Sequence, residues 1–514
     1  MTVLSVVTEP LGGSPLAQHA VAGAEPHGWL VQRPVGAAAW RARADVARAS
    51  VARDWAAALG PALGSGAARV ADVAAAEGVV VTTGQQPGLL GGPLYTLYKA
   101  LTARALAAEI ERATGVRATA VFWAATDDAD IDEARTAMIA APGGAARFVG
   151  PANGVDGQVM GTRVLGDVTT AVQAAIAAAG GDAEPVLMRA LDEAYVASQT
   201  VGGAYVTLLR ALLEPLGVSV LDAWHPAFRA AATPHLARAL GVAHAGAKAV
   251  HARDEAIRAA GLTPQVAEVE GLSHVFALSD GIKLRIPLAD AARYAADAAA
   301  GSLSANVLLR PVLEAALMPT VAYVAGPGEL AYFAQATALA DALGMRAPLG
   351  VPRWSGTVIE PQVARMLDRR ALTLDELVDP HAAETVRARA SLDAQALAAF
   401  ARLRAMSDAE SAQLASLVPP GVPARSVEGM RHQLHHRIDR MERRFAAAAK
   451  RADSELMRDL ATVRGALRPE GGRQERSIAW FPYVARHGEA LLGLLEAQMD
   501  LHAARLVNGA GAAG

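Results

Sequence analysis

Residues 78–99 constrain the fold more than any other stretch, because a strand, a glycine-rich loop and a helix follow one another there. The apolar run 78–83 is rich in β-branched side chains, which predicts a buried strand. The helical pattern 93–113 begins at Pro93, a residue that suits a first helical turn. Four glycines between them permit positive φ angles and close approach to a ligand: Gly84, Gly88, Gly91 and Gly92.

This loop and the start of its helix predict an anion-binding site, because N–H groups at such places favour a phosphate or a carboxylate. The spacing matches neither G-x-G-x-x-G nor G-x-x-x-x-G-K-[ST], the two common nucleotide fingerprints. In their place stand Gln85 and Gln86, whose amides both donate and accept hydrogen bonds. Tyr95, Thr96 and Lys99 follow near the positive end of the helix. Thr96 and Lys99 could meet a phosphate, and an ordinary surface position is an equal alternative for Lys99.

Further apolar runs predict a parallel sheet. Ala118–Ala125 is interpreted as a second buried strand, and Val218–Asp222 and Thr320–Ala325 as further core strands. Strands that alternate with helices are typical of βαβ units with right-handed crossovers. Ligands bind such sheets at the carboxyl ends of the strands. We expect the mixed segments 150–215 and 245–310 to be insertions that wall this site.

An acidic cluster follows the strand 118–125, where that rule places a ligand. Such carboxylates can hold a divalent metal, bind a substrate ammonium or act as general base. A solvated helix start is the alternative, but the density of acids exceeds what a cap requires, so we favour a functional role. The glycine and distal glutamate of a calcium loop are missing, and we expect no metal site. The cluster comprises Asp127, Asp128, Asp130, Asp132 and Glu133.

Two arginines and one glutamate are further candidates. Arg310 and Arg353 each adjoin a proline in an otherwise apolar segment. A buried guanidinium needs an anionic partner, either a structural carboxylate or a substrate, and we favour a substrate for both. Glu329 lies at the turn after the strand 320–325, just before a helix expected from about Leu330, and the same two alternatives apply to it.

From about residue 384 the pattern changes to long helices without strand signals. A helix near 385–417, a break at Pro419–Pro420 and a second long helix predict an antiparallel pair. We expect the second helix to join two copies of the chain in a coiled coil, and residues 508–514 to be disordered. Its apolar residues step by four and three, with one longer step, as in a heptad pattern: Leu434, Ile438, Met441, Phe445, Ala448, Ala452, Leu456, Leu460, Val463 and Leu467.

Charge and composition exclude several classes of function. The chain has 48 Lys and Arg against 51 Asp and Glu, and its net charge of −3 offers no overall attraction for nucleic acid or an anionic membrane. No apolar run reaches the ~18 residues of a membrane span, and no secretory signal is visible, so we expect a cytoplasmic protein. The chain has no cysteine, which excludes disulfides and a cysteine nucleophile. For His432, His435 and His436 a solvated face is favoured over a zinc site.

Several segments of the chain match motifs of one known family: Thr83–Lys99, Val121–Glu133, Asn306–Pro311, Pro319–Phe333, Val351–Arg353, Gln474–Arg476 and Trp480–Tyr483. They occur in family order from about residue 75 to 490, and they resemble the cysteine ligases of bacillithiol biosynthesis (BshC). The family usually has Glu-Asp-His-Asp where this chain has Asp127-Asp128-Ala129-Asp130, so this chain has no imidazole at that place.

The resemblance implies an α/β fold whose Rossmann-like parallel sheet is similar to that of class I aminoacyl-tRNA synthetases. Inserted connecting segments and a C-terminal coiled coil that forms a homodimer complete it. It implies the last step of bacillithiol synthesis, in which the carboxyl group of L-cysteine is joined to the amine of glucosaminyl-malate. An amide from a free carboxylate requires activation. ATP or another nucleotide would supply it, and the sequence leaves the cofactor unknown.

With this resemblance, we expect the loop and helix 84–99 to bind the activating nucleotide or the malate end. The acids 127–133 are expected to take amino groups, and Arg310 and Arg353 carboxylates. The catalytic residues are expected to be Gln86, Asp127, Asp128, Asp130 and Glu329. The expected binding residues are Gly84, Gln85, Gly88, Tyr95, Thr96, Lys99, Arg310, Tyr323, Gly326, Gly328 and Arg353.

Two other classes stay open at this point: a glycosyltransferase-like Rossmann enzyme, and a non-catalytic coiled-coil dimer that senses a nucleotide. The expected domain organisation has five parts. Residues 1–150 form the first part of the core, 151–310 core strands with insertions, 311–383 the last part of the core, 384–470 the dimerising coiled coil, and 471–514 a C-terminal helical segment with a flexible tail.

Overall fold

The computed structural model describes residues 3–23, 26–181, 183–379, 389, 392–452 and 454–509. They divide into two compact units. The described residues of the larger unit fall within Leu4–Ile139, Ala146–Val358 and Glu475–Gly514, and those of the smaller within Met1–Val3, Ala140–Ala145 and Ile359–Gln474. The five domain ranges expected from the sequence stay a proposal.

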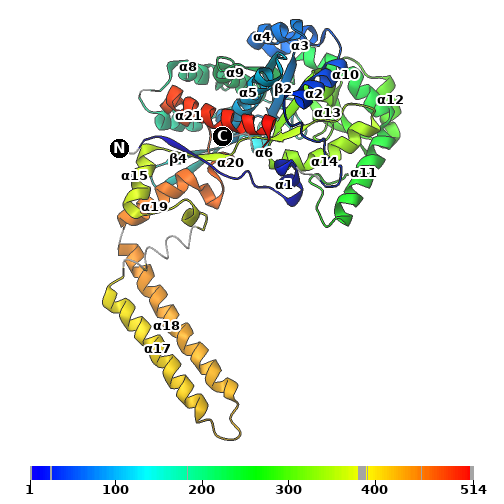
Figure 1. The fold of residues 1–514 in the computed structure, drawn as a ribbon. Coiled ribbons are helices and arrows are strands. Elements are labelled where there is room, and N and C mark those ends of the chain that lie inside the picture. The colour runs from blue at the N-terminus through cyan, green and yellow to red at the C-terminus, as the bar shows by residue number, and fades with distance from the viewer. Residues whose placement is uncertain are drawn as a thin grey trace. The chain divides into compact units, whose positions relative to one another are not determined.

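A five-stranded parallel sheet of order β11-β10-β2-β3-β6 forms the centre of the larger unit (Figure 1). All four strands predicted from the sequence are present, and the expected Rossmann-like parallel sheet is confirmed. Because β10, β2 and β3 are neighbours, their carboxyl ends lie side by side. The strands are β2 Val79–Gln85, β3 Ala118–Ala124, β6 Val218–Asp222, β10 Thr320–Ala325 and β11 Gly350–Pro352.

Three helices place the strand ends. Helix α5 (Leu94–Thr114) connects β2 to β3 and packs against α21 (Phe481–Asn508). Pro93 precedes α5 as its N-cap and is not part of its first turn. Helix α14 (Pro327–Ala342) follows β10 directly, and so begins three residues before the expected start at Leu330. Its early start has a physical reason, since proline suits the first helical position.

The segment 245–310 contributes a separate antiparallel sheet of order β8-β7-β9, which we call the inserted sheet. Its strands are β7 Leu272–Ser279, β8 Ile282–Pro287 and β9 Leu303–Ala305. Two further strand pairs are β1 Ser5–Thr8 with β12 Gly356–Ile359, and β4 Thr136–Ala141 with β5 Gly144–Val149. Further helices are α1 Pro15–Ala22, α2 Ala37–Ala49, α3 Trp55–Leu63, α4 Ala67–Ala75, α6 Ile131–Ala134, α7 Thr169–Ala179, α8 Pro185–Ala194, α9 Val201–Leu213, α10 Pro226–Gly241, α11 Ala243–Ala259, α12 Ala291–Ala296, α13 Arg310–Leu317 and α20 Gln474–Ser477.

The smaller unit is helical, and two of its helices form the predicted antiparallel pair (Figure 1). Arg404 in the middle of the first helix bonds to Asp439 of the second at 2.7 Å, while Asp408, one turn later, pairs with Arg431 at 3.2 Å. The two helices are antiparallel, because the residue numbers of the contacts rise along the first helix while they fall along the second. The helices of this unit are α15 Pro361–Arg370, α17 Ala394–Ser416, α18 Ala424–Ala452 and α19 Ser454–Leu467.

The apolar heptad positions from Leu434 to Leu467 were expected to form one coiled-coil contact, and this prediction is wrong for their second half. Helix α18 ends at Ala452 and α19 begins at Ser454. On α19, Val463 and Leu467 are buried with Ile359 in a core of the smaller unit, because heptad spacing also suits packing inside a fold.

Some predictions fall outside the described residues: the side chain of Ala452, the expected helix start near residue 385, and residues 510–514 of the expected disordered tail. Asn508, the first residue of that tail, is the last residue of α21. None of the described helices is both long enough and apolar enough to cross a membrane.

Candidate active site

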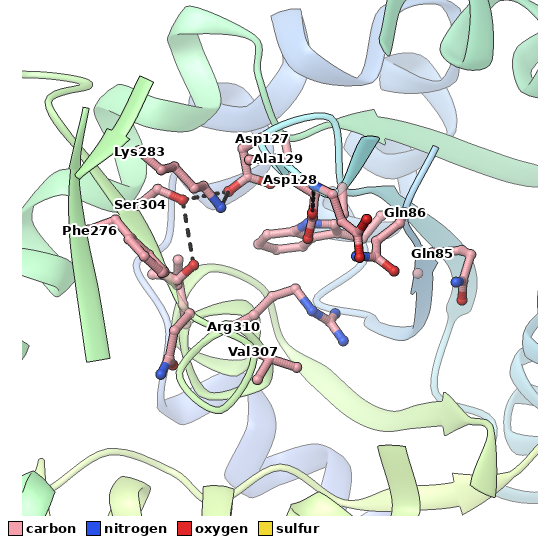
Figure 2. A pocket seen from close by; sticks show the side chains of 18 of the residues that line it. Gln85, Gln86, Asp127, Asp128, Ala129, Phe276, Lys283, Ser304, Val307 and Arg310 are labelled. Carbon is pink, nitrogen blue, oxygen red and sulfur yellow. Dashed lines mark hydrogen bonds and ion pairs between the residues drawn. The ribbon is translucent and has the colours of Figure 1, made fainter. Parts of the chain in front are cut away.

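A cavity of about 770 Å3 lies at the carboxyl ends of β2, β3 and β10. Gly84, Asp127 and Gly326 all line it, so the structure brings together the three strand–turn–helix junctions singled out in the sequence. Further expected site residues that line it are Gln85, Gln86, Tyr95, Lys99, Asp128, Asp130, Arg310, Gly328, Glu329 and Arg353. In Figure 2, Asp127 and Asp128 lie between Gln85 and Gln86 on one side and the inserted sheet on the other.

Three expected site residues do not line this cavity. Thr96 is fully buried within α5, so its expected contact with a phosphate is corrected: the hydroxyl is out of reach of a ligand. Gly88 lines a neighbouring cavity of about 280 Å3. Tyr323 is buried, and its hydroxyl donates to Glu329 Oε1 at 2.6 Å. Tyr323 therefore supports a residue of the cavity wall and does not face a ligand itself.

The glycine loop does not present the expected open anion cradle. The Gly91 N–H donates to the Tyr195 hydroxyl at 3.1 Å, and the Gly91 carbonyl accepts from the Trp480 indole at 2.8 Å. The Leu94 N–H donates to the Ile478 carbonyl at 2.9 Å. A Cβ on Gly91 would lie 2.5 Å from the Trp480 indole, so protein packing explains this glycine. The N–H groups of Gly91 and Leu94 therefore already donate to other groups of the chain.

Lys99 is not a surface lysine, since its side chain is 1% exposed. Its ammonium donates to Glu329 Oε2 at 2.6 Å, to Gln85 Oε1 at 3.2 Å and to the Gly84 carbonyl. Burial lowers the pKa of Lys99, and Glu329 opposes that shift. Burial alone would raise the pKa of Glu329, but Lys99 and Arg310 bring it below its ordinary value. The ion pair thereby ties the end of β2 to the start of α14.

Arg310, the first residue of α13, lines the cavity. Its guanidinium already donates hydrogen bonds to other side chains of the protein. Its Nη2 donates to the hydroxyls of Tyr323 and Tyr332, each at 3.0 Å, and its Nη1 lies 3.3 Å from Glu314 Oε2. Burial raises the pKa of Glu314 to about 7, and Arg310 opposes that shift. Arg310 is thus a fixed positive charge at the cavity wall.

Arg353 is bound by a structural carboxylate, which corrects its expected pairing with a substrate. Its guanidinium donates to both oxygens of Glu475, at 2.9 and 2.7 Å, and both side chains are at most 2% exposed. Glu475 also accepts from the Ser355 hydroxyl at 3.0 Å and the Gly356 N–H at 3.2 Å. Both oxygens of the carboxylate are therefore satisfied by the protein.

The two glutamines differ in how firmly they are held. Gln85 donates to the Tyr95 hydroxyl at 3.1 Å and accepts from Lys99. No residue that the structure describes hydrogen-bonds to the side chain of Gln86, which lines the cavity. Its amide is therefore available to donate to, or accept from, a bound molecule.

The acidic loop combines a helix cap with carboxylates that face the cavity. Asp130 caps α6 by accepting from the Asp132 N–H at 3.2 Å, so the helix-start explanation applies to it. Asp128 accepts from the Asp130 N–H at 2.8 Å. Asp127 is oriented toward the inserted sheet, where Ser304 donates to it at 2.7 Å and the Lys283 ammonium lies 3.7 Å away (Figure 2). Among the described residues, no three His, Cys, Asp or Glu are grouped to hold a metal ion.

Two family models together match residues 62–354 and 356–505. Their descriptions are "Bacillithiol biosynthesis BshC, N-terminal Rossmann-like domain" and "Bacillithiol biosynthesis BshC, C-terminal coiled-coil domain". The chain belongs to the BshC family. The resemblance stated from the sequence motifs is thereby confirmed.

Curated BshC relatives match most of the chain. It is 32% identical over 435 residues to the "Putative cysteine ligase BshC" of Solibacter usitatus, with 80% of each chain covered. It is 31% identical over 443 residues to the protein of that name from Koribacter versatilis, with 81% of each covered. With the Symbiobacterium thermophilum protein of that name it shares 30% over 462 residues, or 83% of this chain and 82% of the relative. BshC is thus a ligase family.

Sequence reasoning missed the part of this BshC site that comes from the inserted sheet. Phe276, Lys283, Arg285 and Ser304 all line the cavity. A signal for two of them was present, because Ile282-Lys-Leu-Arg-Ile286 alternates apolar and basic residues. Such alternation predicts a half-buried strand with both basic side chains on one face.

Proposed function

We propose that the chain joins the carboxyl group of L-cysteine to the amine of glucosaminyl-malate, the last step of bacillithiol synthesis. The family supports a cysteine ligase of this pathway. The proposal for these two substrates rests on the mixed charge of one cavity. The carboxylates of Asp127 and Asp128 line it together with Arg310 and Lys283. Substrates that carry both ammonium and carboxylate groups need both signs, whereas a nucleic acid needs only cations.

The reaction needs an activated carboxyl group, because joining a carboxylate to an amine releases water overall. In our proposal a carboxylate oxygen of cysteine attacks the α-phosphorus of ATP, and pyrophosphate leaves. The amine nitrogen of the sugar then attacks the acyl carbon of the resulting acyl-adenylate. The nitrogen gives up a proton, and AMP leaves with the electron pair of the broken C–O bond.

The cavity offers residues for each need of this step. Asp127 or Asp128 accepts the proton from the attacking amine, a role that carboxylates commonly fill. The unoccupied amide of Gln86 donates to the oxygen that gains negative charge in the transition state. Lys99 and Glu329 act as positioning residues, since their ion pair holds the Gly84 carbonyl and the start of α14.

Deleting the gene is expected to abolish bacillithiol in cells that make it and to cause glucosaminyl-malate to accumulate. The expectation follows directly from loss of the last step. Mass spectrometry of low-molecular-weight thiols and their precursors measures both compounds. The wild-type chain should restore bacillithiol and the Asp128→Ala variant should not. Normal bacillithiol in a deletion strain that contains no second such enzyme would disprove the proposed reaction.

We also propose that two copies of the chain associate through α17 and α18. Both helices carry apolar side chains in contact with solvent, among them Met406 (62% exposed) and Met441 (45% exposed). An isolated helical hairpin gains by covering such residues. The matching C-terminal family model describes a coiled-coil domain, which supports an association by these helices.

The variant Met406→Glu with Met441→Glu is expected to sediment as a monomer where the wild-type chain sediments as a dimer. These positions are preferred to Phe445, because that ring packs edge-on against Phe400 inside the hairpin, with centroids 5.3 Å apart. Analytical ultracentrifugation measures the mass, and Gln413→Glu, an exposed polar position on α17, is the control. A double variant that stays dimeric would place the interface elsewhere.

A further inference from the structure

One face of the inserted sheet is turned to the cavity. Phe276 is paired with Arg285 on β8 and with Ser304 on β9, and Leu278 is paired with Lys283. Directly opposed residues of antiparallel strands project to the same side of a sheet. All five of these residues line the cavity. Residues of the opposite face are buried in the hydrophobic core: Val275, Ala277 and Ile286.

Two cations flank the Phe276 ring on this face. The Lys283 ammonium lies 5.3 Å and the Arg285 guanidinium carbon 5.7 Å from the ring centroid. The Lys283 ammonium lies 3.7 Å from the carboxylate of Asp127. The Arg285 guanidinium forms no hydrogen bond or ion pair with any residue that the structure describes. The face therefore presents an uncompensated positive charge over an aromatic surface, which suits an anionic ligand with an apolar side.

Backbone hydrogen bonds hold this basic face at a set distance from the acidic loop. The segment 157–160 runs between the two. The Lys283 N–H donates to the Gly157 carbonyl at 2.8 Å, and the Met160 N–H donates to the Asp128 carbonyl at 2.8 Å. Because both bonds involve main-chain atoms, the cations and the carboxylates are preorganised relative to one another before a ligand binds.

We propose that Lys283 and Arg285 bind the dicarboxylate part of the amine substrate, with Phe276 against its sugar ring and Asp127 at its amine. This inference rests on the proposed function and assigns a place to the malate group. A glycoside of glucosamine carries its linked group on C1 and its amine on C2, so the malate carboxylates and the amine must be recognised side by side. The protein offers the matching arrangement, since Lys283 and Asp127 are neighbours.

The other anion that two cations suit is the triphosphate of the activating nucleotide. The position of the pair favours the dicarboxylate, because the basic face adjoins Asp127, a carboxylate that would repel phosphate and attract an amine. Binding measurements with both ligands separate the two assignments, since each predicts which affinity depends on Arg285.

Arg285→Ala is expected to weaken binding of glucosaminyl-malate at least 10-fold, while the affinities for ATP and for D-glucosamine change less than 2-fold. Loss of a charged partner for a carboxylate explains the first effect, and the other two ligands carry no malate. Isothermal titration calorimetry on the full-length chain measures all three. Arg285→Lys should recover part of the affinity. Arg293→Ala is the matched control, because Arg293 is exposed in the same inserted segment and pairs with Asp290 outside the cavity.

The outcomes distinguish the inference from the proposed function. Unchanged glucosaminyl-malate binding in Arg285→Ala, absent binding by the wild-type chain, or a loss confined to ATP would each overturn the dicarboxylate assignment. If wild-type chain with cysteine and ATP forms bacillithiol and Arg285→Ala does so with the same KM for glucosaminyl-malate, the function stands and the subsite fails. If binding depends on Arg285 but no amide product forms, the subsite stands and the proposed function fails.

Discussion

Replacing Glu475 by alanine is expected to lower the free energy of unfolding by about 3–5 kcal/mol. The change leaves the Arg353 guanidinium buried without its partner, at 2% exposure. It also removes the acceptor of the Ser355 hydroxyl and the Gly356 N–H. An uncompensated buried charge costs more than the pair gains, so the effect should far exceed that of a surface pair. Urea unfolding followed by circular dichroism measures the free energy.

A surface ion pair provides the control for this experiment. Arg293→Ala removes a pair with Asp290 in which the side chains are 59% and 45% exposed, so a change below about 1 kcal/mol is expected. The double variant Arg353→Met with Glu475→Leu should regain much of the lost stability, because it removes both charges. A Glu475→Ala protein with wild-type stability and lost activity would instead support the role for Arg353 expected from the sequence, binding of a substrate carboxylate.

The central sheet was predictable because its strands have a simple pattern in the sequence. Strands buried on both faces appear as continuous apolar runs, and the boundaries of Val218–Asp222 and Thr320–Ala325 match the structure. The heptad pattern was less informative, since the same spacing describes a dimer seam and a helix packed in its own core. Val463 and Leu467 belong to the second kind, because they are buried in the core of the smaller unit.

The roles of charged residues were harder to predict than their places. Lys99 and Arg353 lie at the cavity as expected, but each has a carboxylate partner far away in the sequence, Glu329 and Glu475. A single sequence contains no local sign of such a pairing. The strand that carries Lys283 has a local signal in the alternating run 282–286, but the pairing of Lys283 with Asp127 arises only when the inserted sheet folds over the end of β3.

The Asp127→Asn variant is expected to lose about 100-fold in kcat/KM for the amine substrate, equal to ~2.7 kcal/mol of transition-state stabilisation. Asparagine preserves the size of the side chain and an oxygen that can accept from the Ser304 hydroxyl. It removes the negative charge and the capacity to take a proton. Steady-state kinetics with glucosaminyl-malate varied at saturating cysteine and ATP measure the loss.

A matched replacement in the same loop separates this effect from a general change of charge. Asp132→Asn alters the charge equally, but the Asp132 side chain is 80% exposed and pairs only with Arg135 at 2.8 Å among the described ion pairs, so activity should stay within 2-fold. If Asp127 accepts the proton, Asp127→Asn must lower kcat at saturating glucosaminyl-malate as well as kcat/KM. A variant in which only the KM for glucosaminyl-malate rises, or whose melting temperature falls in step with its activity, would show that Asp127 does not accept the proton.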